Sequence, residues 1–127
     1  MSTSEANAAR LFRTPFAEVY ALYVKKLERK GRTQAELDEV IEWLTGFDEA
    51  TLKRHLEAGT TFTDFYGAAH INPNASLITG MICGMRVEQI EDPLMQKLRY
   101  LDKLVDELYY GKAMAKVLRV PAAASTA

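Results

Sequence analysis

The sequence has few of the residue types that most often bind metals or form disulfides. Its 127 residues include one cysteine and two histidines. The single cysteine, Cys83, excludes an internal disulfide and a cysteine-rich zinc site. Neither His55 nor His70 has a metal-binding residue three or four positions away, so a zinc site would need ligands from distant segments. We expect no metal and no cofactor, with His55 on the flank of a helix and His70 in a loop.

The sequence also lacks a strong net charge and a long apolar run. The sequence contains 16 basic and 17 acidic residues, which gives a formal net charge of -1. This balance provides no overall field that would concentrate nucleic acid or an anionic membrane around the protein. No apolar run approaches the length that crosses a bilayer, so we expect no membrane association.

The ends of the chain are polar or small in composition. The start lacks the basic and apolar regions of a secretory signal, and we interpret residues 1–13 as a polar leader. Residues 14–119 are expected to form a single helical domain, and residues 120–127 a flexible tail. An unpaired cysteine is typical of a reducing compartment, so the predicted location is the cytoplasm.

Helix start and stop signals recur along the chain. Capping residues precede apolar residues at helical spacing, and a glycine commonly follows each such stretch. The predicted starts are Thr14-Pro15, the capping box Thr33–Glu36, Asp48, Thr61 and Asp92-Pro93, and the predicted stops are Gly31, Gly46, Gly59 and Gly111. The pattern predicts an all-α fold, a compact orthogonal bundle of about six or seven helices.

The longest helix is predicted to run from Pro93 to Tyr110. Its apolar residues step by four, three, four and three, which is typical of a seam between packed helices. The seam residues are Leu94, Leu98, Leu101, Val105 and Leu108. We expect Leu101, at the centre of this seam, to be among the residues most sensitive to truncation.

The segment ASLITGMICGM, residues 75–85, is ambiguous. Its apolar residues fit a helical stripe, but Gly80 and Gly84 each weaken a helix by about 1 kcal/mol relative to alanine. We interpret it as a short buried helix, with a buried strand as the alternative. In either case Cys83 is expected to be buried and slow to react, because free cysteine is among the most buried residue types.

The charged residues after this segment suggest an enzyme as one alternative. Cys83 could serve as a nucleophile if folding brought a histidine close to it. A carboxylate site could form from Glu88, Glu91, Asp92 and Asp102. A metal site in a helical bundle usually also contains histidines, and this stretch has none. We therefore interpret the charges as the solvated face of a helix and assign no catalytic residue.

Two other groups of residues suggest binding surfaces. The basic cluster Lys25–Arg32 could bind nucleic acid weakly, but cations are favoured at a helix C-terminus in any case. The acidic residues that follow in the sequence are expected to cancel its field. Trp43 with Tyr66 could line a groove, although aromatic residues at helical spacing usually form core. Tyr109 and Tyr110 are the predicted exposed contacts of a monomer or weak homodimer.

Three segments together resemble a small bacterial family known only as domain of unknown function 2200. They are YVKKLERKGRTQAELDEVIEWLTGF, SLITGMICGM and RVEQIEDPLMQKLRYLDKLVDELYYGKAM. The resemblance covers Phe16 to Arg119, whereas the residues before Thr14 depart from the family pattern. It implies a small, single-domain, helical, bacterial cytosolic protein, and it brings no assigned activity or site residue.

The sequence does not identify a biochemical activity. The leading interpretation is a small helical interaction or regulatory module with an unknown protein partner. The first alternative is a small enzyme that uses Cys83 or the carboxylates between Glu88 and Asp102. The second alternative is a weak nucleic-acid binder that uses Lys25–Arg32.

Overall fold

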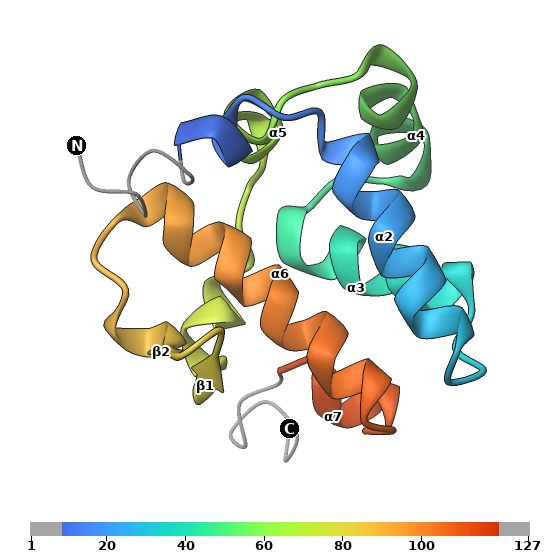
Figure 1. The fold of residues 1–127 in the computed structure, drawn as a ribbon, viewed down its shortest axis with the longest axis vertical. Helices are drawn as coiled ribbons and strands as arrows, with labels where there is room; N and C mark the ends of the chain where they lie inside the picture. Colours follow the sequence, from blue (N-terminus) through green and yellow to red (C-terminus); the bar gives the residue numbers. More distant parts are fainter. Residues whose placement is uncertain (1–8, 120–127) are drawn as a thin grey trace.

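The computed structural model describes residues 9–119, and these form an all-α fold with one small hairpin (Figure 1). Residues 9–12 are helical. The elements that follow are α2 (Phe16–Glu28), α3 (Gln34–Thr45), α4 (Glu49–Ala58), α5 (Phe62–Ala68), η1 (Pro73–Leu77), β1 (Met81–Ile82), β2 (Met85–Arg86), η2 (Val87–Gln89), α6 (Pro93–Tyr109) and α7 (Met114–Val117). The predicted fold class is confirmed.

Most helices begin where their capping residues predict. Thr33 and Glu36 form the complete capping box of α3, and Asp48, Thr61 and Asp92 each accept a backbone N–H at the start of α4, α5 and α6. These caps satisfy N–H groups that have no partner inside the helix. The predicted long helix is therefore confirmed, with α6 running from Pro93 to Tyr109.

The start of α2 differs from its prediction. Thr14 does not cap this helix, because its hydroxyl donates to the carbonyl of Arg10. Pro15 is extended and forms an isolated antiparallel bridge with Thr61. Backbone hydrogen bonds on both sides of this bridge join the start of α2 to the start of α5. The helix thus begins at Phe16 because the preceding residues pair with another segment.

The core is built around α6, which contacts α2, α3, α5, α7, β1 and η2. Its buried residues include the predicted seam residues Leu98, Leu101, Val105 and Leu108, and also Leu104. At the start of α2, Phe16 stacks on Phe65 with ring centroids 3.9 Å apart, and Phe62 and Tyr66 pack edge-on to Phe16. These contacts make α6 the central helix of the fold, with most of its apolar residues covered by other parts of the chain.

The predicted buried helix over residues 75–85 is wrong. This segment forms η1 and then the antiparallel hairpin β1–β2. Cys83 and Gly84 make the two-residue turn with φ values of +50° and +78°, the backbone that such hairpin turns require. The strand alternative is correct only for the second half of the segment, where β1 pairs with β2, the strand that directly follows the turn. Ile78 and Val87, on either side of the hairpin, are fully buried.

We predict that Leu101→Ala lowers the free energy of unfolding by about 2–5 kcal/mol, because the change removes buried apolar surface and leaves a cavity. Leu101 is 0% exposed. Chemical denaturation with an unchanged slope would measure the loss. Leu22→Ala is the matched control, since Leu22 is 62% exposed. A loss for Leu101→Ala no larger than the control's would contradict this packing.

We predict that the capping box makes stability fall in acid. The backbone N–H of Thr33 and then the Arg32 guanidinium lower the pKa of Glu36, against the opposing effect of burial. A lowered folded-state pKa stabilises the protein above the unfolded pKa, and this contribution is lost as the pH falls through the folded pKa. Between about pH 5 and pH 3, the wild type should therefore lose more stability than Glu36→Gln in parallel denaturant titrations. Equal losses would contradict the prediction.

Candidate functional site

Cys83 is exposed at the tip of the hairpin, so the prediction of a buried cysteine is wrong. The two-residue turn places it outside the core, where neither strand covers it. Its Sγ atom lies 3.4 Å from Nη1 of Arg99 on α6. The same Nη1 atom donates to Oδ2 of Asp102 at 2.6 Å. Folding therefore brings together two groups of the enzyme alternative, Cys83 and Asp102, through one arginine.

Asp102 also connects this arginine to the core. Its second carboxylate oxygen accepts a hydrogen bond from the buried hydroxyl of Tyr23. Burial raises the pKa of Tyr23 well above its usual value, and the Asp102 charge adds to this. Burial and then Asp102 also raise the pKa of Tyr66, whose buried hydroxyl has no hydrogen-bond partner within residues 9–119. Both phenols therefore stay protonated at neutral pH.

The enzyme alternative needs a general base beside Cys83, and neither histidine provides one. His55 Nδ1 lies 3.0 Å from the hydroxyl of Thr60, and the ring packs on Phe47. His70 is exposed in the loop after α5. The guanidinium of Arg99 is a hydrogen-bond donor with no acceptor atom, so it cannot act as a base toward the thiol. The cluster can hold a thiol near a cation, but it lacks the nucleophile–base pair of a hydrolase.

The remaining carboxylates of the enzyme alternative do not converge. Glu88 accepts the backbone N–H of Gly80 and pairs with Arg86, Asp92 caps α6, and Glu91 is exposed. Within the part of the chain that the structure describes, no three His, Cys, Asp or Glu side chains come together as a metal site. The four carboxylates that the sequence suggested as one site therefore do not form a common site in the structure.

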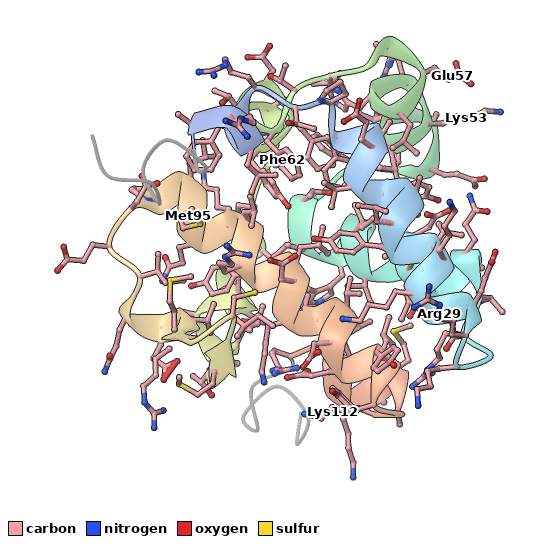
Figure 2. All side chains as sticks on the ribbon, viewed as in Figure 1. Arg29, Lys53, Glu57, Phe62, Met95 and Lys112 are labelled. Atoms are coloured by element: carbon pink, nitrogen blue, oxygen red, sulfur yellow. The ribbon has the colours of Figure 1, made fainter. Side chains whose placement is uncertain are left out.

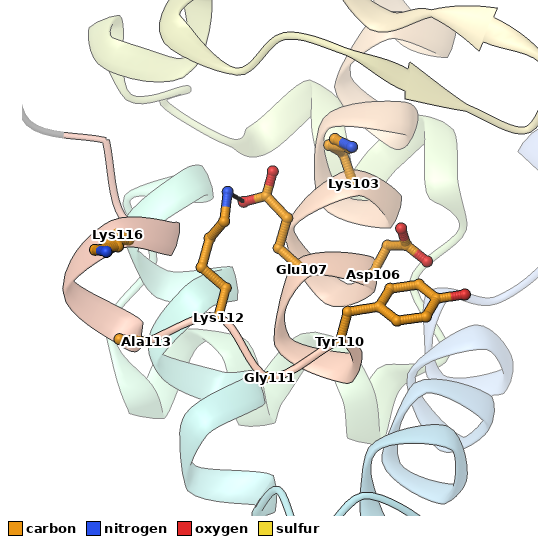
Figure 3. A pocket seen from close by; sticks show the side chains of 8 residues that line it. All are labelled: Lys103, Asp106, Glu107, Tyr110, Gly111, Lys112, Ala113 and Lys116. Atoms are coloured by element: carbon orange, nitrogen blue, oxygen red, sulfur yellow. Dashed lines mark ion pairs between the residues drawn. The ribbon is translucent and has the colours of Figure 1, made fainter.

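A second site lies around the C-terminal end of α6, where a surface hollow has a volume of about 510 Å³ (Figure 3). The hollow is lined by Lys103, Asp106, Glu107, Tyr110, Gly111, Lys112, Ala113 and Lys116. Tyr110 is 75% exposed. The hollow forms because Gly111, with φ at +90°, turns the chain out of α6 before α7 begins.

Glu107 fixes the position of α7 beside α6. Its side chain is buried and takes two hydrogen bonds from Arg119, at 2.6 and 2.7 Å. The Lys112 Nζ atom lies 3.6 Å from the same carboxylate (Figure 3). A carboxylate this buried requires paired cations, since removing its partners would leave an uncompensated charge. Glu107 is therefore already neutralised by protein groups and is not available to bind a cation.

Folding brings the basic cluster Lys25–Arg32 against the same end of α6. The Nζ atoms of Lys26 and Lys30 lie 5.0 and 4.9 Å from the ring centre of Tyr109, which is within cation–π range. Arg32 donates to the carbonyls of Leu108 and Lys112. We define the lysine–tyrosine surface as the group formed by Lys26, Lys30, Lys103, Tyr109, Tyr110, Lys112 and Lys116.

Two carboxylates, those of Asp106 and Glu107, lie among the lysines of the lysine–tyrosine surface, and both are paired with cations. Asp106 lies 3.6 Å from Lys26, and Glu107 is held by Arg119 and Lys112. Lys103 directs its Nζ to the carbonyl of Met81, and neither Lys103 nor Lys116 forms an ion pair within the described ranges. The surface therefore has an excess of positive charge.

The expected cancellation of the Lys25–Arg32 field is only partial. Glu36 pairs with Arg32 at 2.6 Å, but the other acidic residues of α3 gather at the corner between α3 and α4. Burial raises the pKa of Glu42 at this corner, and the nearby charges of Asp38, Glu49, Asp48 and Glu39 raise it further. In Figure 2, Lys53 on α4 lies near the opposite end of the molecule from Lys112. The structure thus separates charges that are neighbours in sequence.

The alternative in which Trp43 and Tyr66 line a groove is wrong, and the interpretation of these aromatic residues as core is confirmed for Tyr66, which is fully buried. Trp43 is partly buried. Within the lysine–tyrosine surface, the sequence indicates Tyr109, Tyr110 and the basic cluster Lys25–Arg32 as possible contacts. It does not indicate Lys112, Lys116 or the pairing of Glu107 with Arg119, and no local spacing marks those residues.

Comparison of the sequence and structure with known proteins identifies a family that the chain matches. Residues 10–119 match the model of an uncharacterised protein family conserved in bacteria, DUF2200. The chain belongs to this family. A solved structure, the crystal structure of uncharacterised protein SP1917, is 43% identical in sequence with a TM-score of 0.81, over 86% of this chain and 90% of that one. No curated protein matches.

The DUF2200 match confirms the resemblance identified from the sequence and extends it to residue 10. The end of the predicted polar leader takes part in the fold: Leu11 and Phe12 pack against the core, and Thr63 donates to the carbonyl of Phe12. The rest of that leader, residues 1–8, and the predicted tail, residues 120–127, lie outside the described residues. Within residues 9–119, no helix of this DUF2200 protein is both long and apolar enough to span a membrane.

We predict that Cys83 of this DUF2200 protein reacts readily with a thiol reagent in the native state, because its side chain is exposed. Stoichiometric labelling at neutral pH should proceed without unfolding, at a rate close to that in denaturant. The far-ultraviolet circular dichroism of the labelled protein should be unchanged. Labelling that occurs only after denaturant is added would show that the thiol is covered.

Proposed function

We propose that this protein is a binding module that recognises an anionic partner through the lysine–tyrosine surface. The observation that carries the proposal is the separation of charge. Basic side chains from α2, α6 and α7 lie with the exposed Tyr110 around the C-terminal end of α6, and the carboxylates among them, Asp106 and Glu107, are paired. The other acidic residues of α3 and α4 lie at a different corner. A nearly neutral chain thus presents a local positive field.

The composition of the surface suits binding. Tyrosine offers a large, rigid contact area with a polar tip, and it is enriched among the residues that contribute most to interfaces. Lysines around it attract an oppositely charged partner over a distance and orient its approach. The rigid end of α6 and the buried Glu107–Arg119 pair hold these groups in place. These features support recognition rather than covalent chemistry at this surface.

The proposal includes a monomer or weak homodimer in the bacterial cytoplasm. The central position of α6 argues against a tight dimer, because its apolar residues are mostly covered by the chain itself and few remain for a second copy. The lone thiol supports a reducing compartment, and the family is conserved in bacteria. Sedimentation at micromolar concentration would test the oligomeric state.

The proposal can be tested with two generic polyanions, polyglutamate and a single-stranded oligodeoxythymidylate. At least one of them should shift the backbone amide resonances of Tyr110, Lys112 and Lys116 in the intact protein. Added salt should weaken the effect, because it screens exposed charges. The double variant Lys112→Glu/Lys116→Glu should bind at least about tenfold more weakly, a difference of about 1.4 kcal/mol.

The control is Lys53→Glu/Arg54→Glu on α4, which makes the same change in net charge at exposed residues outside the hollow. This control should bind as the wild type does. If neither polyanion perturbs the lysine–tyrosine surface, or if the control weakens binding as much as the Lys112/Lys116 variant, the proposed function is wrong.

A further inference from the structure

The lysine–tyrosine surface has an apolar side chain at each end. Tyr110, at the C-terminal end of α6, is 75% exposed. Met81, at the start of β1, is 52% exposed. The Nζ atom of Lys103 lies 3.3 Å from the carbonyl oxygen of Met81, so Met81 adjoins the Lys103 end of the hollow. Lys103 thus lies beside one exposed apolar side chain, Met81, and the hollow that it lines is bordered by a second largely exposed side chain, Tyr110.

The spacing of these contacts fits a short segment of a partner. Lys103 on α6 and Tyr110, which caps the C-terminal end of α6, both line the hollow and are seven residues apart. Seven residues of α-helix span about 10 Å, roughly two turns. A partner helix of two or three turns, lying along this face, would reach both ends. Methionine is well suited to such contacts, because its flexible side chain adapts to different apolar groups.

We propose that the partner of this surface is an acidic amphipathic segment of another protein, an inference that rests on the proposed function. Its apolar side chains contact Tyr110 and Met81, and its acidic side chains lie against Lys103, Lys112 and Lys116. Charge complementarity selects the partner and orients it. The exposed apolar ends add contact area that a purely charged partner cannot use.

Three features favour a protein segment over nucleic acid. Proteins that bind single strands stack successive bases on several aromatic side chains, and among residues 9–119 Tyr110 is the only phenylalanine, tyrosine or tryptophan with a largely exposed side chain. The Tyr109 ring is occupied by Lys26 and Lys30. An exposed methionine beside the lysines provides no phosphate contact. A short segment with mixed acidic and apolar residues uses each of these groups.

The experiment compares three probes of equal charge on the intact protein by fluorescence anisotropy. The first is a peptide with glutamate and leucine at amphipathic helical spacing. The second is the same peptide with each leucine replaced by serine. The third is a single-stranded oligodeoxythymidylate. The leucine peptide should bind at least about tenfold more tightly than the serine peptide, and also more tightly than the oligonucleotide.

The variant Met81→Ser/Tyr110→Ser should remove most of the preference for leucine over serine and keep the weaker, salt-dependent binding of both peptides. Leu22→Ser is the matched control, because Leu22 is 62% exposed on α2 and does not line the hollow. It should keep the full preference. Circular dichroism and thermal unfolding would verify that each variant is folded.

Equal binding of the two peptides would overturn the inference while leaving the proposed function intact. Tighter binding of the oligonucleotide than of the leucine peptide would do the same and would favour a nucleic-acid partner. A leucine preference that survives in Met81→Ser/Tyr110→Ser would place the peptide elsewhere and overturn the inference. Absence of binding by all three probes would contradict the proposed function itself.

Discussion

The burial of α6 is the constraint on which the rest of the structure depends. Leu101, Leu104 and Leu108 are fully buried, and α6 contacts α2, α3, α5 and α7 as well as the hairpin. The shorter helices cannot bury their apolar faces alone, because one amphipathic helix needs another surface to cover it. The helices α2, α3, α5 and α7 assemble on α6, whereas α4 packs on α2 and α3. The lysine–tyrosine surface forms where α2, α6 and α7 lie together at the C-terminal end of α6.

One polar pair lies on the buried face of α6 and connects the packing of the fold to the lysine–tyrosine surface. Glu107 lies among the buried residues of α6 and is held by Arg119 in a two-point contact. Such a pair contributes orientation as well as energy, because both hydrogen bonds require one geometry. It holds the chain after Gly111 against α6, so the same contact that secures α7 also forms the wall of the hollow.

Local signals explain which parts of the fold could be predicted. The Thr33–Glu36 box, Asp48, Thr61 and Asp92 act within their own first turn, so the sequence alone reveals them. The hairpin was not predicted, because its apolar residues also fit a helical stripe. These residues are Leu77, Ile78, Met81 and Ile82. Its true form depends on the left-handed turn at Cys83 and on contacts with Arg99 and Lys103 far along the chain. Cys83 was expected to be buried because free cysteines usually are, but its position in the hairpin turn leaves it exposed.

The candidate surface was harder to predict because charge cancels along the sequence but not in space. Lys25–Arg32 precedes an acidic run in sequence, yet α3 carries most of that run toward the corner with α4. The fold then places Lys112 beside Arg32, which is 80 residues earlier in the chain. At physiological ionic strength, exposed charges more than about 8 Å apart are largely screened from each other. A partner that docks at the end of α6 therefore experiences the lysines there and little of the acidic corner, so net charge is a poor guide to what this protein binds.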